Sequence, residues 1–244
     1  MRVKPLRIAV WSGPRNLSTA LMRSFASRGD CAVVDEPFYA AYLAASGADH
    51  PMRSEVLASQ ANCAAEVARQ CLDGEVAQPI QYQKHMTQHM LPEFDQRFIS
   101  QLTNVFLIRE PERVVASFAD RMGSFTREEI GFRQQAEIFH RVVDETGEIP
   151  AVVDARDVRA DPAGVLQKLC QRLGIDFSTQ MLSWEAGIHP DYGVWASHWY
   201  GSALRSTGFA PPDESPYPSL SGESAEIAEW ARGYYDQLAE YRVR

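Results

Sequence analysis

Short runs of apolar residues recur along the chain and are separated by longer amphipathic segments. Residues 6–10, 31–34, 103–108 and 151–153 are such runs, and residues 79–84 alternate between apolar and polar side chains. Strands of a parallel sheet that is covered on both faces are nearly continuous hydrophobic runs, because neither face meets water. The pattern therefore predicts about five short strands, most of them buried on both faces.

The segments between these runs have apolar residues three and four positions apart, which is the spacing of helices that bury one face. The predicted helices cover residues 17–25, 57–72, 132–143, 165–173 and 227–238, and a further helix begins at Pro111. Residues 38–53 are predicted to be a connecting loop, and residues 187–220 an irregular region. Strands that alternate with helices indicate an α/β fold. We predict a single domain over residues 1–244, with a parallel sheet of about five strands flanked by helices.

Composition and charge exclude several classes of function. The 244 residues carry a formal net charge of −8, which argues against a general nucleic-acid binder or a protein of anionic membrane surfaces. Four scattered cysteines form no CxxC pair, so a zinc ribbon and thioredoxin-like chemistry are not expected. The apolar run near the N-terminus is too short for a signal peptide, and no segment reaches the length of a membrane span. We expect a cytoplasmic protein.

The loop after the first predicted strand has the features of a site for a small anion. Residues 13–17 join the strand to a helix, and Asn16 is predicted to cap the N-terminus of that helix. Backbone N–H groups and the positive end of the helix dipole then point at one place. Arg15 adds a cation there, and the hydroxyl groups of Ser18 and Thr19 add donors.

Charged residues follow several of the predicted strands. Arg15 comes after the first strand, Glu36 after the second, Lys84 and His85 at the end of the third, and Arg109 after the fourth. In α/β proteins, ligands bind beyond the carboxyl ends of parallel strands. We therefore expect these side chains to meet at one edge of the sheet.

Two common nucleotide motifs are absent from the sequence. Counting from Gly13, the positions of a Walker A loop that need a second glycine, a lysine and a hydroxyl hold Ser18, Thr19 and Ala20. No G-x-G-x-x-G dinucleotide fingerprint occurs either. The fold is predicted to be P-loop-like, but ATP hydrolysis is not the expected chemistry.

Three short motifs instead resemble those of the sulfotransferase family. Residues 15–19 are similar to its 5′-phosphosulfate loop, whose pattern is a basic residue, two small residues, and then Ser or Thr followed by Thr. Arg109, with Pro111 two residues later and Ser117 eight residues later, is similar to its second signature. Asp35-Glu36-Pro37 resembles the Glu-Pro of bacterial and carbohydrate members, and Leu173-Gly174 is a weaker similarity. The chain departs from the family pattern at Leu17, where glycine is usual, and at Arg15, where the cytosolic branch has lysine. We interpret it as a divergent bacterial-type member.

The resemblance implies a donor, 3′-phosphoadenosine-5′-phosphosulfate (PAPS), and residues that bind it. The 5′-phosphosulfate would be bound by Pro14, Arg15, Asn16, Leu17, Ser18, Thr19 and Ala20. The 3′-phosphate would be bound by Arg109 and Ser117, and Arg205 in the stretch 205–209 is a candidate for the late loop that covers it. Aromatic residues just before that stretch are candidates for stacking on the adenine.

Sulfuryl transfer needs a cation beside the bridging oxygen of the donor and a base for the acceptor. Arg15 suits the first role. Glu36 is the first candidate for the base and His85 the second, while Lys84 is a candidate for holding the sulfuryl group. No metal is expected: His85 and His89 are four residues apart, but residue 86 is Met and no third ligand is near.

Two other functions stay open at this stage. The first is an atypical phosphotransferase of the nucleotide-kinase type, which would need magnesium and ATP. The second is a nucleotide-binding protein without catalysis, because the Leu17 side chain would crowd a sulfuryl group. The expected acceptor is a hydroxyl or amine of a small molecule or carbohydrate, in a pocket formed by residues 38–53 and the stretch after Gly187. We expect no nucleic-acid or membrane partner, and we make no prediction of oligomeric state.

Overall fold

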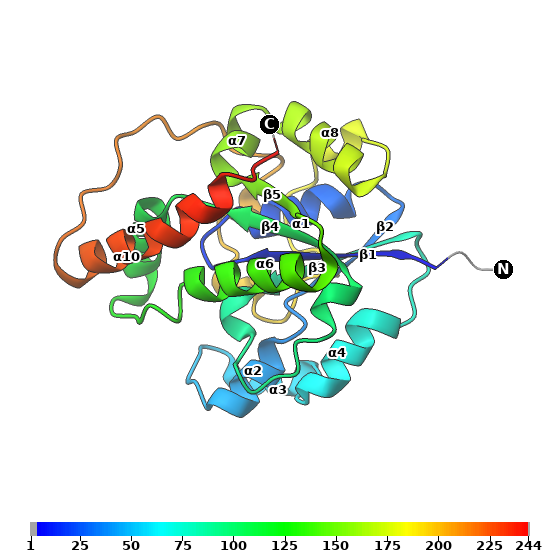
Figure 1. Ribbon diagram of the computed structural model, residues 1–244, viewed down its shortest axis with the longest axis horizontal. Coiled ribbons are helices and arrows are strands. Elements are labelled where there is room, and N and C mark those ends of the chain that lie inside the picture. Colours follow the sequence, from blue (N-terminus) through cyan, green and yellow to red (C-terminus); the bar gives the residue numbers. More distant parts are fainter. Residues whose placement is uncertain (1–3, 244) are drawn as a thin grey trace.

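The computed structural model describes residues 4–243 and contains one parallel sheet of five strands. Its strands are β1 (Leu6–Ser12), β2 (Cys31–Asp35), β3 (Ile80–Met86), β4 (Thr103–Ile108) and β5 (Ala151–Asp154). They pair in the order β2-β3-β1-β4-β5, and every pairing is parallel (Figure 1). The predicted α/β fold is confirmed, because these strands coincide closely with the apolar runs.

Helices cover both faces of the sheet. They are α1 (Ser18–Ala26), α2 (Tyr39–Ser46), α3 (Arg53–Ser59), α4 (Ala64–Asp73), α5 (Pro111–Met122), α6 (Phe132–Thr146), α7 (Ala155–Ala160), α8 (Pro162–Leu173), α9 (Ala196–Trp199) and α10 (Gly222–Ala239). Short 3-10 turns occur at Thr87–His89, Ile99–Gln101, Thr179–Leu182 and Ala203–Arg205. In Figure 1, α6 and α10 lie in front of the sheet.

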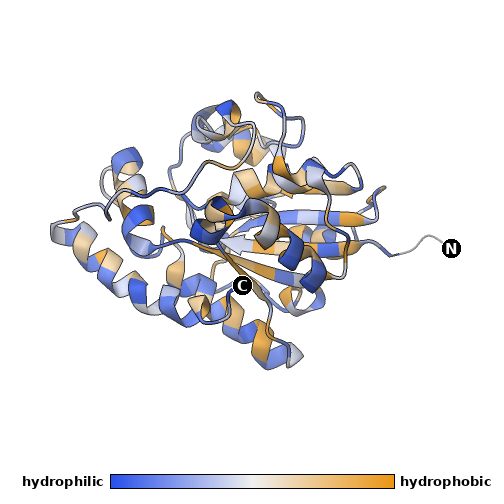
Figure 2. Cartoon of the chain, turned by 90° about the horizontal axis from the view of Figure 1, so that it is seen from above, coloured by the Kyte–Doolittle hydropathy of each residue, from blue (hydrophilic) through white to orange (hydrophobic). Residues whose placement is uncertain are grey.

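Alternation along the strands divides the core into two layers. Ala9, Trp11 and Phe106 pack with residues of α4, α5, α6 and α10. Their strand neighbours Ile8 and Val10 pack on the other face with α1, α7 and α8. This follows from the period of two in a strand, where successive side chains point to opposite faces. Figure 2 shows hydrophobic residues along the strands and mixed hydropathy along the covering helices.

Three predicted elements were wrong in detail. The predicted loop over residues 38–53 contains α2, and the predicted helix over residues 57–72 is two helices, α3 and α4. The sequence of α2, YAAYLAAS, is apolar on nearly every side, so it shows no polar face and no helical period. The break after α3 arises at Gln60, which is extended and whose side-chain amide accepts a hydrogen bond from Ala40 N. The third strand was predicted to end at Lys84, but β3 continues to Met86, which pairs with Ser12.

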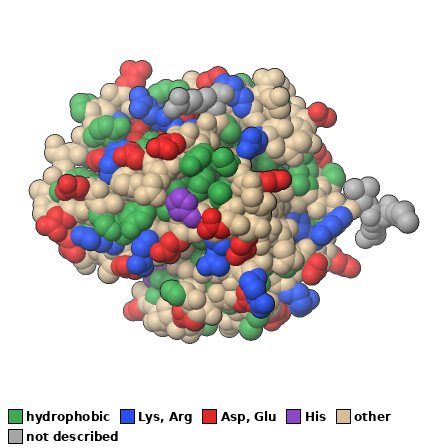
Figure 3. All heavy atoms as spheres, in the orientation of Figure 1, with side chains coloured by type: hydrophobic (Ala, Val, Ile, Leu, Met, Phe, Trp, Pro, Cys, Tyr) green, Lys and Arg blue, Asp and Glu red, His purple; other side chains and the backbone are tan. Residues whose placement is uncertain are grey.

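The outer surface is mixed in charge. Figure 3 shows acidic and basic side chains interspersed over one face of the molecule. Within residues 4–243, no helix combines the length and the apolar character needed to cross a lipid bilayer.

Gly13 precedes the first loop at a position with no space for a side chain. A Cβ atom there would lie 2.5 Å from the backbone oxygen of Ile130. We expect Gly13→Ala to lower the free energy of unfolding by about 2 kcal/mol, since backbone atoms must move to relieve the overlap. Gly233→Ala in α10 is the matched control: a Cβ there contacts nothing within 4 Å, and alanine favours a helix over glycine. Urea unfolding of both variants measures the difference, and equal losses would contradict the prediction.

Candidate active site

The loop between β1 and α1 has the shape of an anion cradle. Leu17 occupies the N-cap position of α1, and no side chain caps the helix. The predicted cap by Asn16 was wrong: its Nδ2 atom donates instead to the backbone oxygen of Leu107, 3.0 Å away, and ties the loop to the end of β4. The first N–H groups of α1 therefore carry no side-chain acceptor and are available to a ligand.

The two sequence motifs predicted to bind the donor lie together. Arg15 Nε donates to Ser117 Oγ at 2.9 Å, and Arg109 Nη1 donates to the backbone oxygen of Arg15 at 2.6 Å. Residues 94 and 102 positions apart thus form one contact network at the carboxyl edge of β1 and β4. This juxtaposition is the one expected from the parallel topology.

A cavity of about 340 Å³ opens beside this network, and we call it the arginine cavity. It is lined by Arg15, Arg109, Arg159, Ser117, Asn16, Leu17, Thr19, Ala20, Trp199, Tyr200, Ser202, Ala203, Ser206, Gly208 and Ala210. The lining contains no acidic residue. Within residues 4–243, no carboxylate lies within 4 Å of a nitrogen of its three arginines. Such a cavity suits a multiply charged anion.

Sequence reasoning missed Arg159, a residue of α7. This helix follows β5 directly, so the rule on strand ends would have pointed to it had the helix been predicted. The Nε atom of Arg159 is buried and has no hydrogen-bond partner in the described part of the chain. An arginine with an unsatisfied buried N–H, facing a cavity with two other arginines, indicates an anionic ligand.

The arginines repel one another. Burial lowers the pKa of Arg109 to about 10, with a further contribution from Arg159, and Glu110 opposes both effects. Burial and then repulsion from Arg121 lower the pKa of Arg15. Both remain charged at neutral pH, and a bound anion would relieve their repulsion.

A second cavity, of about 150 Å³, lies on the other side of the loop, and we call it the aromatic cavity. Its rings include Tyr39, Tyr42, His50, His89 and Trp199. His89 stacks between Tyr39 and Tyr42, with ring centroids 4.6 and 4.9 Å away. The two cavities are neighbours, because they share the lining residues Arg15, Asn16, Thr19, Trp199 and Tyr200.

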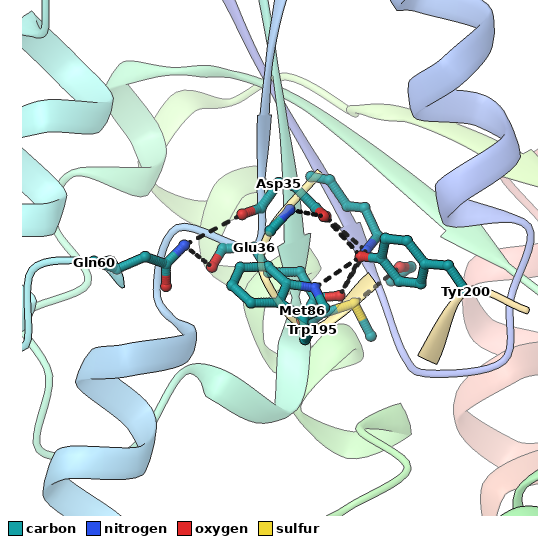
Figure 4. A network of polar contacts seen from close by, with 9 residues as sticks. Asp35, Glu36, Gln60, Met86, Trp195 and Tyr200 are labelled. Atoms are coloured by element: carbon teal, nitrogen blue, oxygen red, sulfur yellow. Dashed lines mark hydrogen bonds and ion pairs between the residues drawn. The ribbon is translucent and has the colours of Figure 1, made fainter. Parts of the chain in front are cut away.

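Four polar side chains form a buried cluster at the wall of the aromatic cavity. Lys84 Nζ donates to Asp35 Oδ1 at 2.9 Å, to Glu36 Oε1 at 2.6 Å and to Tyr200 Oη at 2.6 Å. We call Asp35, Glu36, Lys84 and Tyr200 the charge cluster (Figure 4). It joins the ends of β2 and β3 to the segment after α9. Both Glu36 and Lys84 thus lie at the expected edge of the sheet.

Glu36 is the member of the cluster that presents a free oxygen to the aromatic cavity. Its Oε1 atom is held by Lys84, whereas Oε2 accepts no hydrogen bond within residues 4–243. Gln60 Nε2 donates to the Glu36 backbone oxygen at 3.2 Å and fixes the main chain. A carboxylate with one anchored and one free oxygen is suited to accept a proton from a bound substrate.

Arg15 and Glu36 also share an unusual backbone conformation. Among the described residues, only Arg15 (φ 58°), Glu36 (φ 44°) and Met52 (φ 62°) have positive φ without being glycine. A left-handed conformation destabilises an L-residue by about 1–2 kcal/mol, and such strain gathers at functional sites. Its presence at both sequence-predicted positions supports a functional role for each.

His85 lies outside the site. Because Lys84 and His85 are neighbours on β3, they point to opposite faces of the sheet. The His85 ring stacks on Trp11 with centroids 4.3 Å apart, and burial lowers its pKa to about 3. It lines neither cavity, so the structure does not place it where an acceptor would bind. His50 and His89 are the histidines that line the aromatic cavity, and His89 was considered in the sequence only as a metal ligand.

Other predicted residues lie as follows. Pro14 and Ser18 line the aromatic cavity, and Leu17 and Ala20 line the arginine cavity. Arg205 is exposed and lines neither, although Ser206 and Gly208 beside it line the arginine cavity. Over residues 4–243, no group of three or more His, Cys, Asp or Glu side chains is arranged to hold a metal ion.

The fold and the site together define a class. A parallel α/β sheet with an anion cradle after its first strand is typical of proteins that bind the phosphates of a nucleotide. A family model of the sulfotransferase domain matches residues 6–239. The chain therefore belongs to the sulfotransferase domain family, as the three sequence motifs predicted.

Two curated proteins of Arabidopsis thaliana are similar in sequence, the branched-chain-amino-acid aminotransferase-like proteins 1 and 2. They are 38% identical over 213 residues and 35% identical over 209 residues, which is 87% and 86% of this chain. The matched parts are only 38% and 37% of those proteins, so the chain spans less than two fifths of their length.

Two solved sulfotransferase domains share the fold. The domain of the Synechococcus PCC 7002 olefin synthase is 17% identical with a TM-score of 0.56, and covers 93% of this chain and 94% of that one. The domain of the curacin biosynthetic pathway is also 17% identical, with a TM-score of 0.54, and covers 93% and 97%. At this identity the likeness supports the fold alone.

Proposed function

We propose that this sulfotransferase moves a sulfuryl group from PAPS to a hydroxyl or amine of a small acceptor. The observation that carries the proposal is the pair of cavities on either side of Arg15. One is cationic and free of acidic residues, and the other presents the free oxygen of Glu36. A group bound at Arg15 would face both.

The donor would occupy the arginine cavity. Its 5′-phosphosulfate would lie against residues 14–20 and the N-terminus of α1, with Arg15 beside the bridging oxygen that gains negative charge. Arg109 and Ser117, joined to Arg15 by hydrogen bonds, would hold the 3′-phosphate. Arg159 would be a third cation for it. Arg205, which is exposed, has no assigned role.

The acceptor would enter the aromatic cavity. Glu36 Oε2 would take the proton of its hydroxyl or amine, and the resulting lone pair would attack sulfur. An engineered protein cavity of about 150 Å³ holds a molecule the size of benzene, which is close to the volume here. The reacting end of the acceptor is therefore small, and the ring-lined walls favour an aromatic or aliphatic group.

We also propose a cytoplasmic location without nucleic-acid or membrane partners. The four cysteines Cys31, Cys63, Cys71 and Cys170 are free thiols, which supports a reducing compartment. The net charge of −8 supports a small-molecule partner over a polyanion.

Thermal unfolding with adenosine nucleotides tests the donor. We expect adenosine 3′,5′-bisphosphate, at a hundred times its Kd, to stabilise the fold by about 2.7 kcal/mol and to raise Tm by several degrees. Adenosine 5′-monophosphate should raise it less, because Arg109 and Arg159 would lack their phosphate. Absence of any shift with millimolar bisphosphate would overturn the proposal.

The same measurement separates the two alternatives. A larger Tm shift with magnesium and ATP than with the bisphosphate would favour a phosphotransferase of the nucleotide-kinase type. A clear bisphosphate shift, without release of bisphosphate from PAPS over a panel of small phenols, alcohols and amines, would favour a protein that binds nucleotide without catalysis.

A further inference from the structure

The hydrogen-bond arrangement of the Tyr200 hydroxyl group leaves only carboxylate oxygens to accept its proton. Its oxygen accepts from Lys84 Nζ at 2.6 Å and from Trp195 Nε1 at 3.0 Å. Ammonium and indole N–H groups are donors only, so these two contacts fill both lone pairs of the oxygen. The phenolic proton must therefore go to a carboxylate, either Asp35 at 2.8 Å or Glu36 at 3.0 Å.

The hydrogen-bond donors of Lys84 are also all in use. An ammonium group has three N–H donors, and Lys84 directs them to Asp35, Glu36 and Tyr200. The side chain is 1% exposed. No N–H remains for a sulfuryl oxygen, so the structure gives Lys84 a different role from the one expected from the sequence.

Both carboxylate oxygens of Asp35 are engaged, and Asp35 does not line the aromatic cavity. Its Oδ1 atom accepts from Lys84, and its Oδ2 atom accepts from the backbone N–H of Gly193 at 3.1 Å. Both oxygens also lie within hydrogen-bond distance of Tyr200 Oη. Asp35 lines neither cavity, in contrast to Glu36.

The charges of the cluster sum to one negative unit when both carboxylates are ionised and Lys84 is protonated. We propose that Asp35, Lys84 and Tyr200 are positioning residues that hold Glu36 Oε1 and give the cluster the capacity for a single proton, which enters at Glu36 Oε2. As a role in catalysis this inference rests on the proposed function. The arrangement of charges itself does not depend on it.

The proton balance of the transfer step follows. The acceptor O–H or N–H bond breaks and its proton goes to Glu36 Oε2, while the freed lone pair forms a bond to sulfur. The bond from sulfur to the bridging oxygen breaks, and its electron pair stays on the 5′-phosphate of the departing bisphosphate, beside Arg15. The cluster becomes neutral, and it returns the proton to water after the sulfated product leaves.

Burial and charge attraction act in opposite directions on the members of the cluster. Burial would lower the pKa of Lys84, but attraction to Asp35 and Glu36 outweighs it and the net shift is upward. Burial raises the pKa of Asp35, and Lys84 opposes that shift. The other titratable or charged side chains that line the aromatic cavity with Glu36 are Arg15, Tyr39, Tyr42, His50, His89, Arg121 and Glu129.

The cluster is assembled from two distant parts of the chain. Asp35, Glu36 and Lys84 come from the sheet, whereas Trp195 and Tyr200 come from the segment around α9. Figure 4 shows the hydroxyl group of Tyr200 linked to the two carboxylates and to the indole N–H of Trp195. The charge cluster around Glu36 is therefore complete only when the segment around α9 is packed against the sheet.

Infrared titration of the carboxyl groups tests the inference without donor or acceptor. The band of protonated Glu36 is the one that Glu36→Gln removes. We expect Lys84→Met to make this band appear at a pH higher by about one unit, and Asp35→Asn at a pH lower by about one unit, since each variant removes one neighbouring charge of opposite sign. Shifts of the two variants in the same direction, or no shift in either, would overturn the proposal.

Tyr200→Phe is a milder variant that keeps the inference testable if the charge variants do not fold. It removes a hydrogen-bond donor from a carboxylate, so we expect the band of protonated Glu36 to appear at a higher pH. We also expect kcat to fall by about 10- to 100-fold, and the Kd of the bisphosphate to stay within twofold of its original value. The matched control is Tyr192→Phe. The buried hydroxyl group of Tyr192 has no hydrogen-bond partner within residues 4–243, and the centroid of its ring lies 5.3 Å from that of Tyr200. Equal band positions in both variants would overturn the role of Tyr200.

The binding measurement and the infrared titration together distinguish failure of the proposed function from failure of the inference about the charge cluster. If the bisphosphate does not bind but the bands shift in opposite directions, the proposed function fails and the one-proton cluster stands. If binding and transfer occur but the bands do not move, the cluster has no such role and Glu36 works alone.

Discussion

Glu36→Gln is expected to lower sulfuryl transfer by about 100- to 10,000-fold, the usual contribution of a general base. Glutamine keeps the size of the side chain and leaves an amide oxygen to accept from Lys84, but it cannot take a proton. Transfer is measured as bisphosphate released from PAPS with a small phenol or alcohol as acceptor. Binding of the bisphosphate to the same variant, measured by calorimetry, should stay within a few-fold, because Glu36 lines only the aromatic cavity.

Retained turnover in this variant would reject Glu36 as the base. His50 and His89 would then be the next candidates, because both line the same cavity. If the variant loses bisphosphate binding as well as turnover, the substitution has disturbed the left-handed backbone at residue 36, where φ is 44°. The loss of turnover would then reflect a change in the fold and not the loss of a base.

Arg109→Ala is expected to weaken binding of adenosine 3′,5′-bisphosphate by about 10- to 100-fold, as for the loss of a hydrogen bond to a charged group. Adenosine 5′-monophosphate should lose much less, because Arg109 touches the 5′ side only through the backbone oxygen of Arg15. Arg159→Ala should act in the same direction. Calorimetric Kd values for both nucleotides give the comparison.

Arg156→Ala is the matched control for these two variants. Arg156 lies on α7 with Arg159 but lines only a neighbouring cavity, so both Kd values should change less than threefold. If Arg109→Ala weakens the two nucleotides equally, Arg109 does not hold a 3′-phosphate.

The fold could be predicted because buried parallel strands are visible in a single sequence. Runs such as residues 103–108 are apolar throughout, and the helices between them have polar outer faces. The same logic failed for β3, where Gln81, Gln83 and Lys84 are all buried. Their polar atoms are satisfied by hydrogen bonds within the folded chain, so alternation of polar residues did not mark an exposed face. His85 and Met86, which extend β3 beyond the predicted end, are buried as well.

The site residues that follow strands could be predicted from the sequence. The residues that reach the site through contacts between distant parts of the chain could not. Arg15, Glu36 and Arg109 follow strands and meet as the parallel topology requires. Tyr200 lies in a segment without regular spacing, and nothing local to it indicates a partner 164 positions away. Asn16 has the sequence of a helix cap, but the backbone oxygen of Leu107 competes for its amide. Propensity cannot decide between such partners.

The positive φ angles at Arg15 and Glu36 have a consequence for engineering. Glycine would occupy either position without strain, so replacing either residue with glycine would relieve the backbone and remove a charged side chain at the same time. Stability and the charge of the candidate site therefore oppose each other at these two positions.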